Sequence, residues 1–298
     1  MNKNNAHKKP YDFKLLTEQM PNLAEFVFTN QYGTETIDFA NPKAVKALNT
    51  ALLKAHYKIE YWSFPDDNLC PPIPGRVEYI HLLNDLLKTS GINENITILD
   101  LGTGATCIYP LLGNAEYGWK FIASETDKPA FKTAEKIVKK NSLENAITLR
   151  FQDNHQHILT GILKPSEQIS ASMCNPPFFK DEAEAEEKNL QKLKGLGSNA
   201  NTTLRNFSGT AKELCYPGGE KAYLHNYLYQ SSLLKTNCFW YTSLVSKHAL
   251  VKSMQASLKK LGATQIKVLE MKLGNKVSRV VAWTFLSEEA QKKWNPKK

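Results

Sequence analysis

A rigid corner follows the short apolar run Ile169–Cys174, because the next four residues are Asn175, Pro176, Pro177 and Phe178. The run is a strand candidate, and the prolines end it because each ring removes a backbone donor and fixes φ. The corner therefore holds two hydrogen-bond acceptors in place, the side-chain oxygen of Asn175 and the backbone carbonyl of Pro176. An aromatic ring follows directly and can stack on a flat ligand.

A second group of polar residues lies at the ends of three earlier strand candidates. Asp100 precedes Gly102 and Gly104, whose lack of a side chain lets the backbone turn tightly and approach a ligand. Glu125 ends the next strand, where a carboxylate can accept hydrogen bonds from both ribose hydroxyls. Asp153 follows the third strand and can accept from an adenine amino group. Strand ends of a parallel sheet meet at one crevice, so these residues predict a nucleotide site there.

The order of these features resembles the class I S-adenosylmethionine-dependent methyltransferases. Within that class, Asn-Pro-Pro-Phe is typical of enzymes that methylate a planar nitrogen, in adenine, cytosine or a glutamine amide. Such a nitrogen is a poor nucleophile because its lone pair is delocalised. Acceptors at Asn175 and Pro176 would bind both N–H groups, favour a pyramidal nitrogen and aim the lone pair at the methyl group. Phe178 would stack on the base.

Strand and helix patterns alternate along most of the chain. Helical patterns dominate the first ninety residues, including one with Asn41 as N-cap and Pro42 at its first position. We therefore expect a helical extension over residues 1–90 and a Rossmann-like α/β domain over 91–298, with a seven-stranded, mostly parallel sheet and helices on both faces. A long polar loop is expected at about 180–218. The strand candidates are 96–101, 120–125, 146–151, 169–174, 238–245, 265–271 and 279–286, and helix candidates include 129–142, 222–236 and 247–262.

The composition, 42% hydrophobic and 22% charged, is that of an ordinary globular protein. No apolar run reaches the roughly 18 residues of a membrane span, and the polar N-terminus lacks a secretory signal. We therefore expect a soluble, cytoplasmic protein. Five widely spaced cysteines without a Cys-x-x-Cys pair predict neither disulfides nor a zinc site, and no metal is expected.

The formal net charge is +9, and the C-terminal segment accounts for it. Residues 247–298 carry eleven Lys and one Arg against three Glu. This segment is either a solvated face or a contact surface for RNA phosphates, where binding would weaken with added salt.

Several further stretches resemble the bacterial 23S ribosomal RNA adenine-N6 methyltransferase family, over about residues 7 to 286. The stretches are HKKPYDFKLL, IDFANPKAVKALNTALL, IPGRVEYIHLLNDLL, DLGTGATCIYPLLG, MCNPPFF, NFSGTAKELCYPGGE and WYTSLVSK. The resemblance implies S-adenosyl-L-methionine as methyl donor. It also implies that the partner is 23S ribosomal RNA or a large-subunit assembly intermediate.

The resemblance also assigns roles to residues. Arg76 matches a family arginine that pairs with the cofactor carboxylate through its guanidinium fork. His7, Lys8 and Lys9 form an arm expected to bind RNA, although lysine contacts phosphate only as a point charge. The expected catalytic residues are Asn175, Pro176, Pro177 and Phe178. The expected cofactor-binding residues are Arg76, Asp100, Gly102, Gly104, Glu125, Asp153 and Asn175.

Three other interpretations stay open. A protein glutamine-amide methyltransferase shares the corner motif but has less need of a net positive charge. A non-catalytic RNA-binding module would not need Asn175, Glu125 and the glycines together. A nicotinamide-dependent oxidoreductase is disfavoured because Cys107 stands where the third glycine of its fingerprint belongs.

Overall fold

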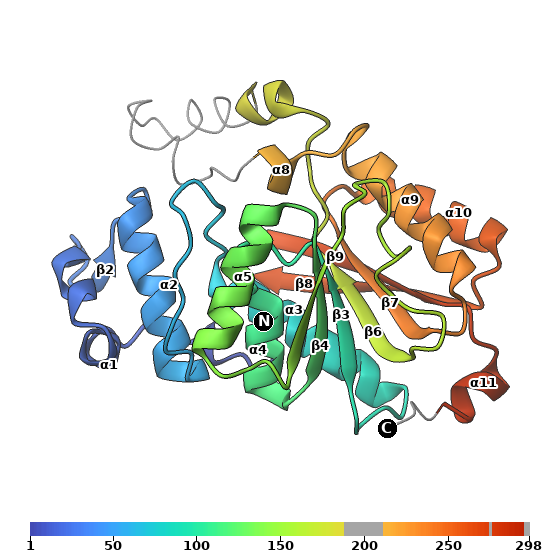
Figure 1. Ribbon diagram of the computed structural model, residues 1–298. Coiled ribbons are helices and arrows are strands. Elements are labelled where there is room, and N and C mark those ends of the chain that lie inside the picture. The colour runs from blue at the N-terminus through green and yellow to red at the C-terminus, as the bar shows by residue number, and fades with distance from the viewer. Residues whose placement is uncertain (188–210, 274–275, 295–298) are drawn as a thin grey trace.

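The computed structural model describes residues 1–187, 211–273 and 276–294, and its centre is a seven-stranded sheet (Figure 1). The strand order is β5-β4-β3-β6-β7-β9-β8. Neighbours from β5 to β7 are parallel, whereas β9 runs antiparallel to β7 and to β8. This arrangement confirms the expected α/β fold. The strands are β3 (Thr97–Leu101), β4 (Lys120–Glu125), β5 (Ile147–Phe151), β6 (Ile169–Cys174), β7 (Cys238–Val245), β8 (Gln265–Leu273) and β9 (Lys276–Thr284).

Alternate side chains of the central strands enter two separate cores. Ile98 and Phe121 belong to one core, whereas their neighbours Leu99 and Ile122 belong to the other. This period of two follows from the pleat of a strand. Helices therefore cover both faces of the sheet (Figure 1). Those of the first core are α2 (Pro42–Tyr57), α3 (Ile73–Thr89), α4 (Ile108–Tyr117) and α5 (Lys128–Lys140), and those of the second are α9 (Gly219–Leu233) and α10 (His248–Leu261).

Helices make up much of the N-terminal segment, which also contains an irregular stretch over residues 58–72 and a small hairpin that the sequence patterns did not predict. Asn41 caps α2 as expected, because its side-chain oxygen accepts from the amides of Lys43 and Ala44. Trp62 donates from Nε1 to the carbonyl of Thr106 at 3.0 Å, which links this segment to the loop before α4. The remaining N-terminal elements are η1 (Ala6–Lys8), α1 (Phe13–Gln19), η2 (Pro21–Phe26), β1 (Val27–Thr29) and β2 (Glu35–Ile37).

Further elements of the structure differ from the sequence patterns. Residues 108–117 form α4, a helix that the patterns did not indicate, although Pro110 is tolerated there within the first turn. The expected loop at 180–218 lies partly outside the described residues, and its described end contains the short helix α8 (Ala211–Leu214). The C-terminal part ends with α11 (Glu288–Lys292).

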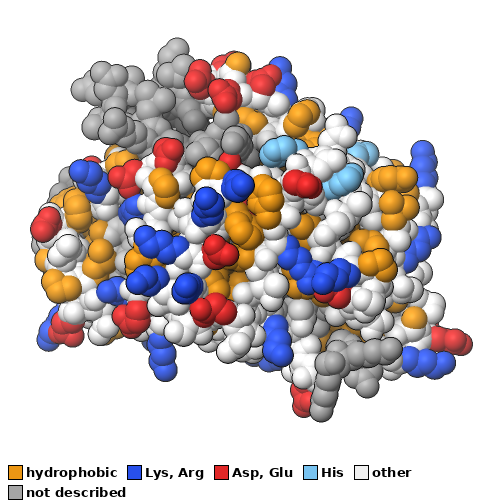
Figure 2. Space-filling view, viewed as in Figure 1, with side chains coloured by type: hydrophobic (Ala, Val, Ile, Leu, Met, Phe, Trp, Pro, Cys, Tyr) orange, Lys and Arg blue, Asp and Glu red, His pale blue; other side chains and the backbone are white. Residues whose placement is uncertain are grey.

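Charged side chains of both signs are scattered over the face of the molecule that carries α5 (Figure 2). Five exposed lysines come from α5 itself, which carries a single exposed glutamate, Glu135. The lysines are Lys128, Lys132, Lys136, Lys139 and Lys140.

Candidate active site

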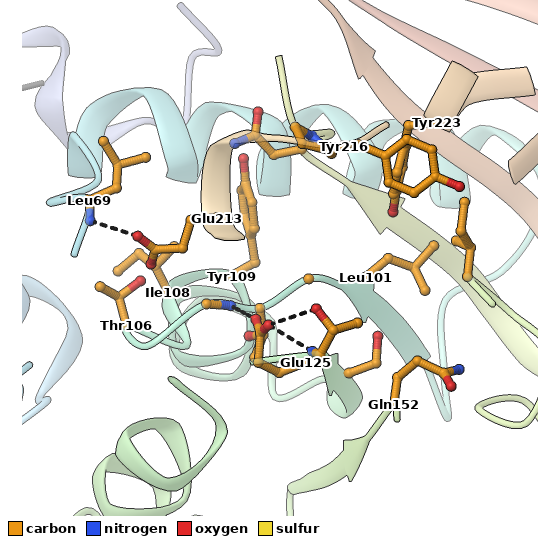
Figure 3. A pocket seen from close by; sticks show the side chains of 18 of the residues that line it. Leu69, Leu101, Thr106, Ile108, Tyr109, Glu125, Gln152, Glu213, Tyr216 and Tyr223 are labelled. Atoms are coloured by element: carbon orange, nitrogen blue, oxygen red, sulfur yellow. Dashed lines mark hydrogen bonds between the residues drawn. The ribbon is translucent and has the colours of Figure 1, made fainter. Parts of the chain in front are cut away.

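A cavity lies at the carboxyl ends of β3, β4 and β6 (Figure 3). This edge of a doubly wound sheet is where such folds bind ligands. The structure brings six of the residues singled out from the sequence into its lining. These are Arg76, Gly102, Gly104, Glu125, Asn175 and Pro177.

The glycine loop after β3 forms the floor of this cavity. Gly102 and Gly104 have φ angles of 70° and 66°, in the left-handed region that glycine adopts without strain. The amide of Thr103 donates to the carbonyl of Ser124 at 2.9 Å, so the loop is tied to β4. These contacts hold the loop backbone against the cavity.

Glu125 is fixed at the end of β4 by three backbone amides. Its Oε2 accepts from the amide of Gly104 at 2.8 Å, and its Oε1 accepts from those of Thr126 and Asp127 at 2.7 and 2.9 Å. Burial raises the pKa of this carboxyl, and the three amides oppose that shift. Because each oxygen can accept more than one hydrogen bond, Oε2 can still accept from a ligand hydroxyl.

Buried polar atoms without hydrogen-bond partners lie beside the glycine loop. They are both carboxylate oxygens of Asp100, Nε of Arg76 and the hydroxyl of Thr103, none of which has a partner of normal geometry among the described residues. Arg76 is held through Nη1, which donates to the hydroxyl of Tyr109 at 2.8 Å. Unpaired buried groups are costly in a folded protein, so this cluster fits a site that a polar ligand completes.

Asp100 is buried and does not itself line the cavity, and it is the most perturbed acid among the expected site residues. Burial raises the pKa of Asp100 from 3.8 to about 7. The Thr103 hydroxyl and the Arg76 guanidinium lower this pKa, whereas the negative charge of Glu125 raises it further. A cation bound beside this carboxyl would favour its charged form. Asp100 and Arg76 together thus provide one site for a positive group and one for a negative group.

The corner after β6 is held by a segment from a later part of the chain. The amides of Phe178 and Phe179 both donate to the carbonyl of Leu214 at 3.0 Å, and the amide of Tyr216 donates to the carbonyl of Phe179 at 2.9 Å. Asn175 and Pro177 line the cavity from this corner. Pro176 is buried beneath the surface, and Phe178 is half-buried next to the cavity without lining it.

The sequence patterns missed several residues that line the cavity. Glu213 of α8 accepts a hydrogen bond from the amide of Leu69 at 3.2 Å, which joins two distant segments (Figure 3). The Glu213 carboxyl also lies close to Gly104. Tyr216, Tyr223 and the exposed His155 and His157 also line it. The only sequence signal for Glu213 and Tyr216 was their place in one stretch of the family resemblance.

Two groups of expected site residues lie away from the cavity. Asp153 is exposed and does not line it; the neighbouring Gln152 does. His7 is buried, with its Nε2 2.7 Å from the hydroxyl of Tyr57, so its ring is packed inside the N-terminal segment. Lys8 and Lys9 are exposed beside it.

Two buried thiols flank the site. Cys107 precedes α4 and Cys174 precedes Asn175, and burial raises the pKa of each to about 12.

Within the described ranges, no three His, Cys, Asp or Glu side chains are grouped to bind a metal ion. None of the helices there is long and apolar enough to cross a membrane.

Curated proteins resemble this chain over almost its whole length. The ribosomal RNA large subunit methyltransferase F of Pseudomonas syringae pv. syringae is 46% identical over 292 residues, which cover 95% of this chain and 89% of that protein. The protein of the same name from Aeromonas salmonicida is 44% identical, covering 97% and 93%.

Solved structures of a human protein share the fold. The catalytic domain of hMettl16 in complex with MAT2A 3'UTR hairpin 1 superposes with a TM-score of 0.81 at 28% identity, covering 97% of this chain and 96% of that one. The N-terminal domain of human METTL16 in complex with SAH superposes with a TM-score of 0.76 at 27% identity, covering 96% and 99%. The sequence model of the RNA methyltransferase family matches residues 1–287. The chain therefore belongs to this family of RNA methyltransferases.

Proposed function

We propose that this enzyme transfers a methyl group from S-adenosyl-L-methionine to the N6 amine of an adenine in 23S, large-subunit ribosomal RNA. The observation that carries the proposal is the placement of the Asn175 corner and of Glu125 in one cavity at the carboxyl ends of parallel strands. Curated relatives at 44–46% identity are named for the large ribosomal subunit RNA. The family match favours RNA over a protein glutamine as substrate.

The residues of the cavity fit S-adenosyl-L-methionine. Its methionyl part carries a carboxylate for Arg76 and an ammonium for Asp100, which matches the unpaired buried atoms of these two residues. Glu125 would accept from the ribose hydroxyls, and the backbone at Gly102 and Gly104 allows close approach. When bound, the cofactor supplies an electrophilic methyl group on a sulfonium. Asp153 is exposed, so any contact it makes to the adenine lies at the rim.

The corner after β6 would orient the acceptor amine. The side-chain oxygen of Asn175 and the carbonyl of Pro176 accept its two N–H groups, which directs the nitrogen lone pair toward the methyl group. Positive charge develops on that nitrogen during transfer, and fixed acceptor dipoles stabilise it without reorganisation. Pro177 keeps the corner rigid, and Phe178 contacts one face of the base. The hydrogen bonds that the amides of Phe178 and Phe179 donate to the carbonyl of Leu214 hold the corner in place.

The N-terminal extension, residues 1–90, would bind the RNA around the target base. Exposed Lys8 and Lys9 are placed to contact phosphates, whereas the buried His7 anchors the arm. The target adenine must leave its stack to reach the cavity, which is least costly in an unpaired region. The substrate is either the RNA itself or a large-subunit assembly intermediate, and we place the reaction in the cytoplasm, where bacterial ribosomes are made.

The test uses methyl-labelled S-adenosyl-L-methionine and total RNA from a strain that lacks this gene. We expect label in a single large-subunit RNA fragment, released on nuclease digestion as N6-methyladenosine, and none with the Asn175→Ala variant. Label in protein instead of RNA, or in a cytosine, would contradict the proposal.

A further inference from the structure

Tyr216 is an aromatic residue of the cavity to which the corner motif assigns no role. It lies between α8 and α9 and lines the same cavity as Asn175 and Pro177. Its neighbour in Figure 3 is Tyr223 of α9, which also lines the cavity. Tyr216 is only half-buried, and it lines the cavity.

Three contacts hold Tyr216 in place, one through its backbone, one through its hydroxyl and one through its ring. Its backbone amide donates to the carbonyl of Phe179 at 2.9 Å, which joins it directly to the corner. Its hydroxyl accepts from Nδ2 of Asn226 at 2.9 Å, and that same Nδ2 donates to the carbonyl of Gln156. The ring of Tyr223 meets it edge to face, with centroids 5.2 Å apart and planes at 89°. A ring fixed this way loses little conformational entropy when a ligand stacks on it.

Tyr223 is placed differently, because its hydroxyl contacts the end of β6. It receives a hydrogen bond from Sγ of Cys174 at 3.3 Å, so Tyr223 braces the end of β6 and supports Tyr216 with its edge. Phe178 lies at the corner with its ring near that of Phe179, at 6.4 Å between centroids, and does not line the cavity. Tyr216 is thus the ring that combines a fixed position, an attachment to the corner and a place in the lining of the cavity.

We propose that Tyr216 contacts the acceptor base directly and forms an aromatic wall of the acceptor half of the cavity. The proposal rests on the proposed function, because it concerns the acceptor half of the same cavity. Enzymes that act on a flipped base commonly hold it between aromatic or apolar side chains. Loss of one stacking ring lowers base binding by roughly 5-fold to 100-fold.

The test compares Tyr216→Leu and Tyr216→Phe with Tyr229→Leu, a matched control at an exposed tyrosine of α9 outside the cavity. Three quantities are measured: kcat with unmethylated large-subunit RNA, RNA affinity by filter binding, and the Kd for S-adenosylhomocysteine by calorimetry. For Tyr216→Leu we expect kcat to fall by roughly 10-fold to 100-fold while both affinities stay within about twofold, because phosphate contacts dominate RNA affinity. Tyr216→Phe keeps the ring, and it and the control should stay within about threefold of wild type.

A second variant keeps the proposal testable if Tyr216→Leu does not fold. Asn226→Ala leaves the ring but removes the hydrogen bonds both to the Tyr216 hydroxyl and to the Gln156 carbonyl, whereas Tyr216→Phe removes only the first. We therefore expect kcat of Asn226→Ala to fall by roughly 3-fold to 10-fold. The proposal is overturned if Tyr216→Leu keeps kcat within threefold of wild type, or if its Kd for S-adenosylhomocysteine weakens as much as kcat falls. A wild-type enzyme that labels no RNA would instead refute the proposed function.

Discussion

Glu125 accepts a hydrogen bond from the backbone amide of Gly104, with 2.8 Å between Oε2 and the amide nitrogen. The contact ties the end of β4 to the loop that follows β3. The carboxylate that would bind a ribose therefore also positions the glycine loop against which the rest of that ligand lies. Substitutions at these residues consequently affect the cofactor half of the cavity as a unit.

Glu125→Gln should weaken cofactor binding. The amide side chain loses the negative charge and places an N–H₂ where acceptors are needed, so we expect the Kd for S-adenosylhomocysteine to rise by roughly 10-fold to 100-fold. Isothermal calorimetry measures this directly. Glu135→Gln, at an exposed position of α5, is the matched control and should bind like wild type. If Glu125→Gln and Glu135→Gln bind S-adenosylhomocysteine equally tightly, Glu125 does not bind the ribose.

Arg76→Lys should also weaken cofactor binding, although the charge is kept. Lysine lacks the planar fork that pairs with a carboxylate and cannot reproduce the bond to Tyr109, so an affinity loss on the order of 10-fold is expected. The control is Arg150→Lys, because Arg150 makes a two-point pair with Glu167 outside the cavity. That change should lower the thermal midpoint but leave cofactor affinity unaltered. Arg76→Lys binding at wild-type strength would contradict carboxylate recognition.

Asp100→Asn should stabilise the protein without ligand, and more so at high pH. The folded-state pKa of about 7 lies above the ordinary value of 3.8, so the folded state binds more protons between these values. Asp100 therefore makes stability fall as pH rises through that window, and asparagine removes the effect. The gain in unfolding free energy should grow by roughly 2–3 kcal/mol between pH 5 and pH 8. Urea melts at both pH values measure it, and a gain independent of pH would show that Asp100 is not buried as described.

Asn175→Ala should abolish methyl transfer while leaving RNA binding intact. Removing a preorganised acceptor of a developing charge costs at least about 100-fold in kcat. RNA affinity should remain within about twofold of wild type, because phosphate contacts dominate it. Single-turnover rates with saturating RNA separate these effects. Near-normal turnover would exclude the role of the Asn175 oxygen.

Replacing both Lys8 and Lys9 by Gln should weaken RNA binding and flatten its dependence on salt. Each lost phosphate contact reduces the slope of log affinity against log salt by roughly one. A matched control replaces Lys139 and Lys140 at the end of α5, which are equally exposed. The salt dependence of RNA affinity could instead stay unchanged in the Lys8 and Lys9 variant, or fall equally in both variants. Either result would show that Lys8 and Lys9 do not make the phosphate contacts.

The sheet and half of the site could be predicted from the sequence because they depend on local signals. Short apolar runs marked the strands, and Asn-Pro-Pro after Cys174 marked the corner. In a parallel sheet, the ends of β3, β4 and β6 must then lie together, which placed Glu125 near Asn175. Helix α2 was equally predictable, since Asn41 and Pro42 mark its start.

The rest of the site depends on contacts between distant segments that have no periodic signal. The bonds from Phe178 and Phe179 to Leu214 link residues more than thirty positions apart, and so does the bond from Leu69 to Glu213. Nothing in a single sequence shows that Leu214 packs on the corner. The burial of His7 was hidden for the same reason, because its partner Tyr57 lies fifty positions away.

The buried thiols of Cys107 and Cys174 have a consequence for chemical selectivity. A thiolate is a better nucleophile than an aromatic amine and would compete for an activated methyl group. Burial keeps the pKa of both thiols at about 12, so at neutral pH they stay protonated and unreactive. The apolar packing that supports the glycine loop and the corner thus also protects the enzyme from alkylating itself.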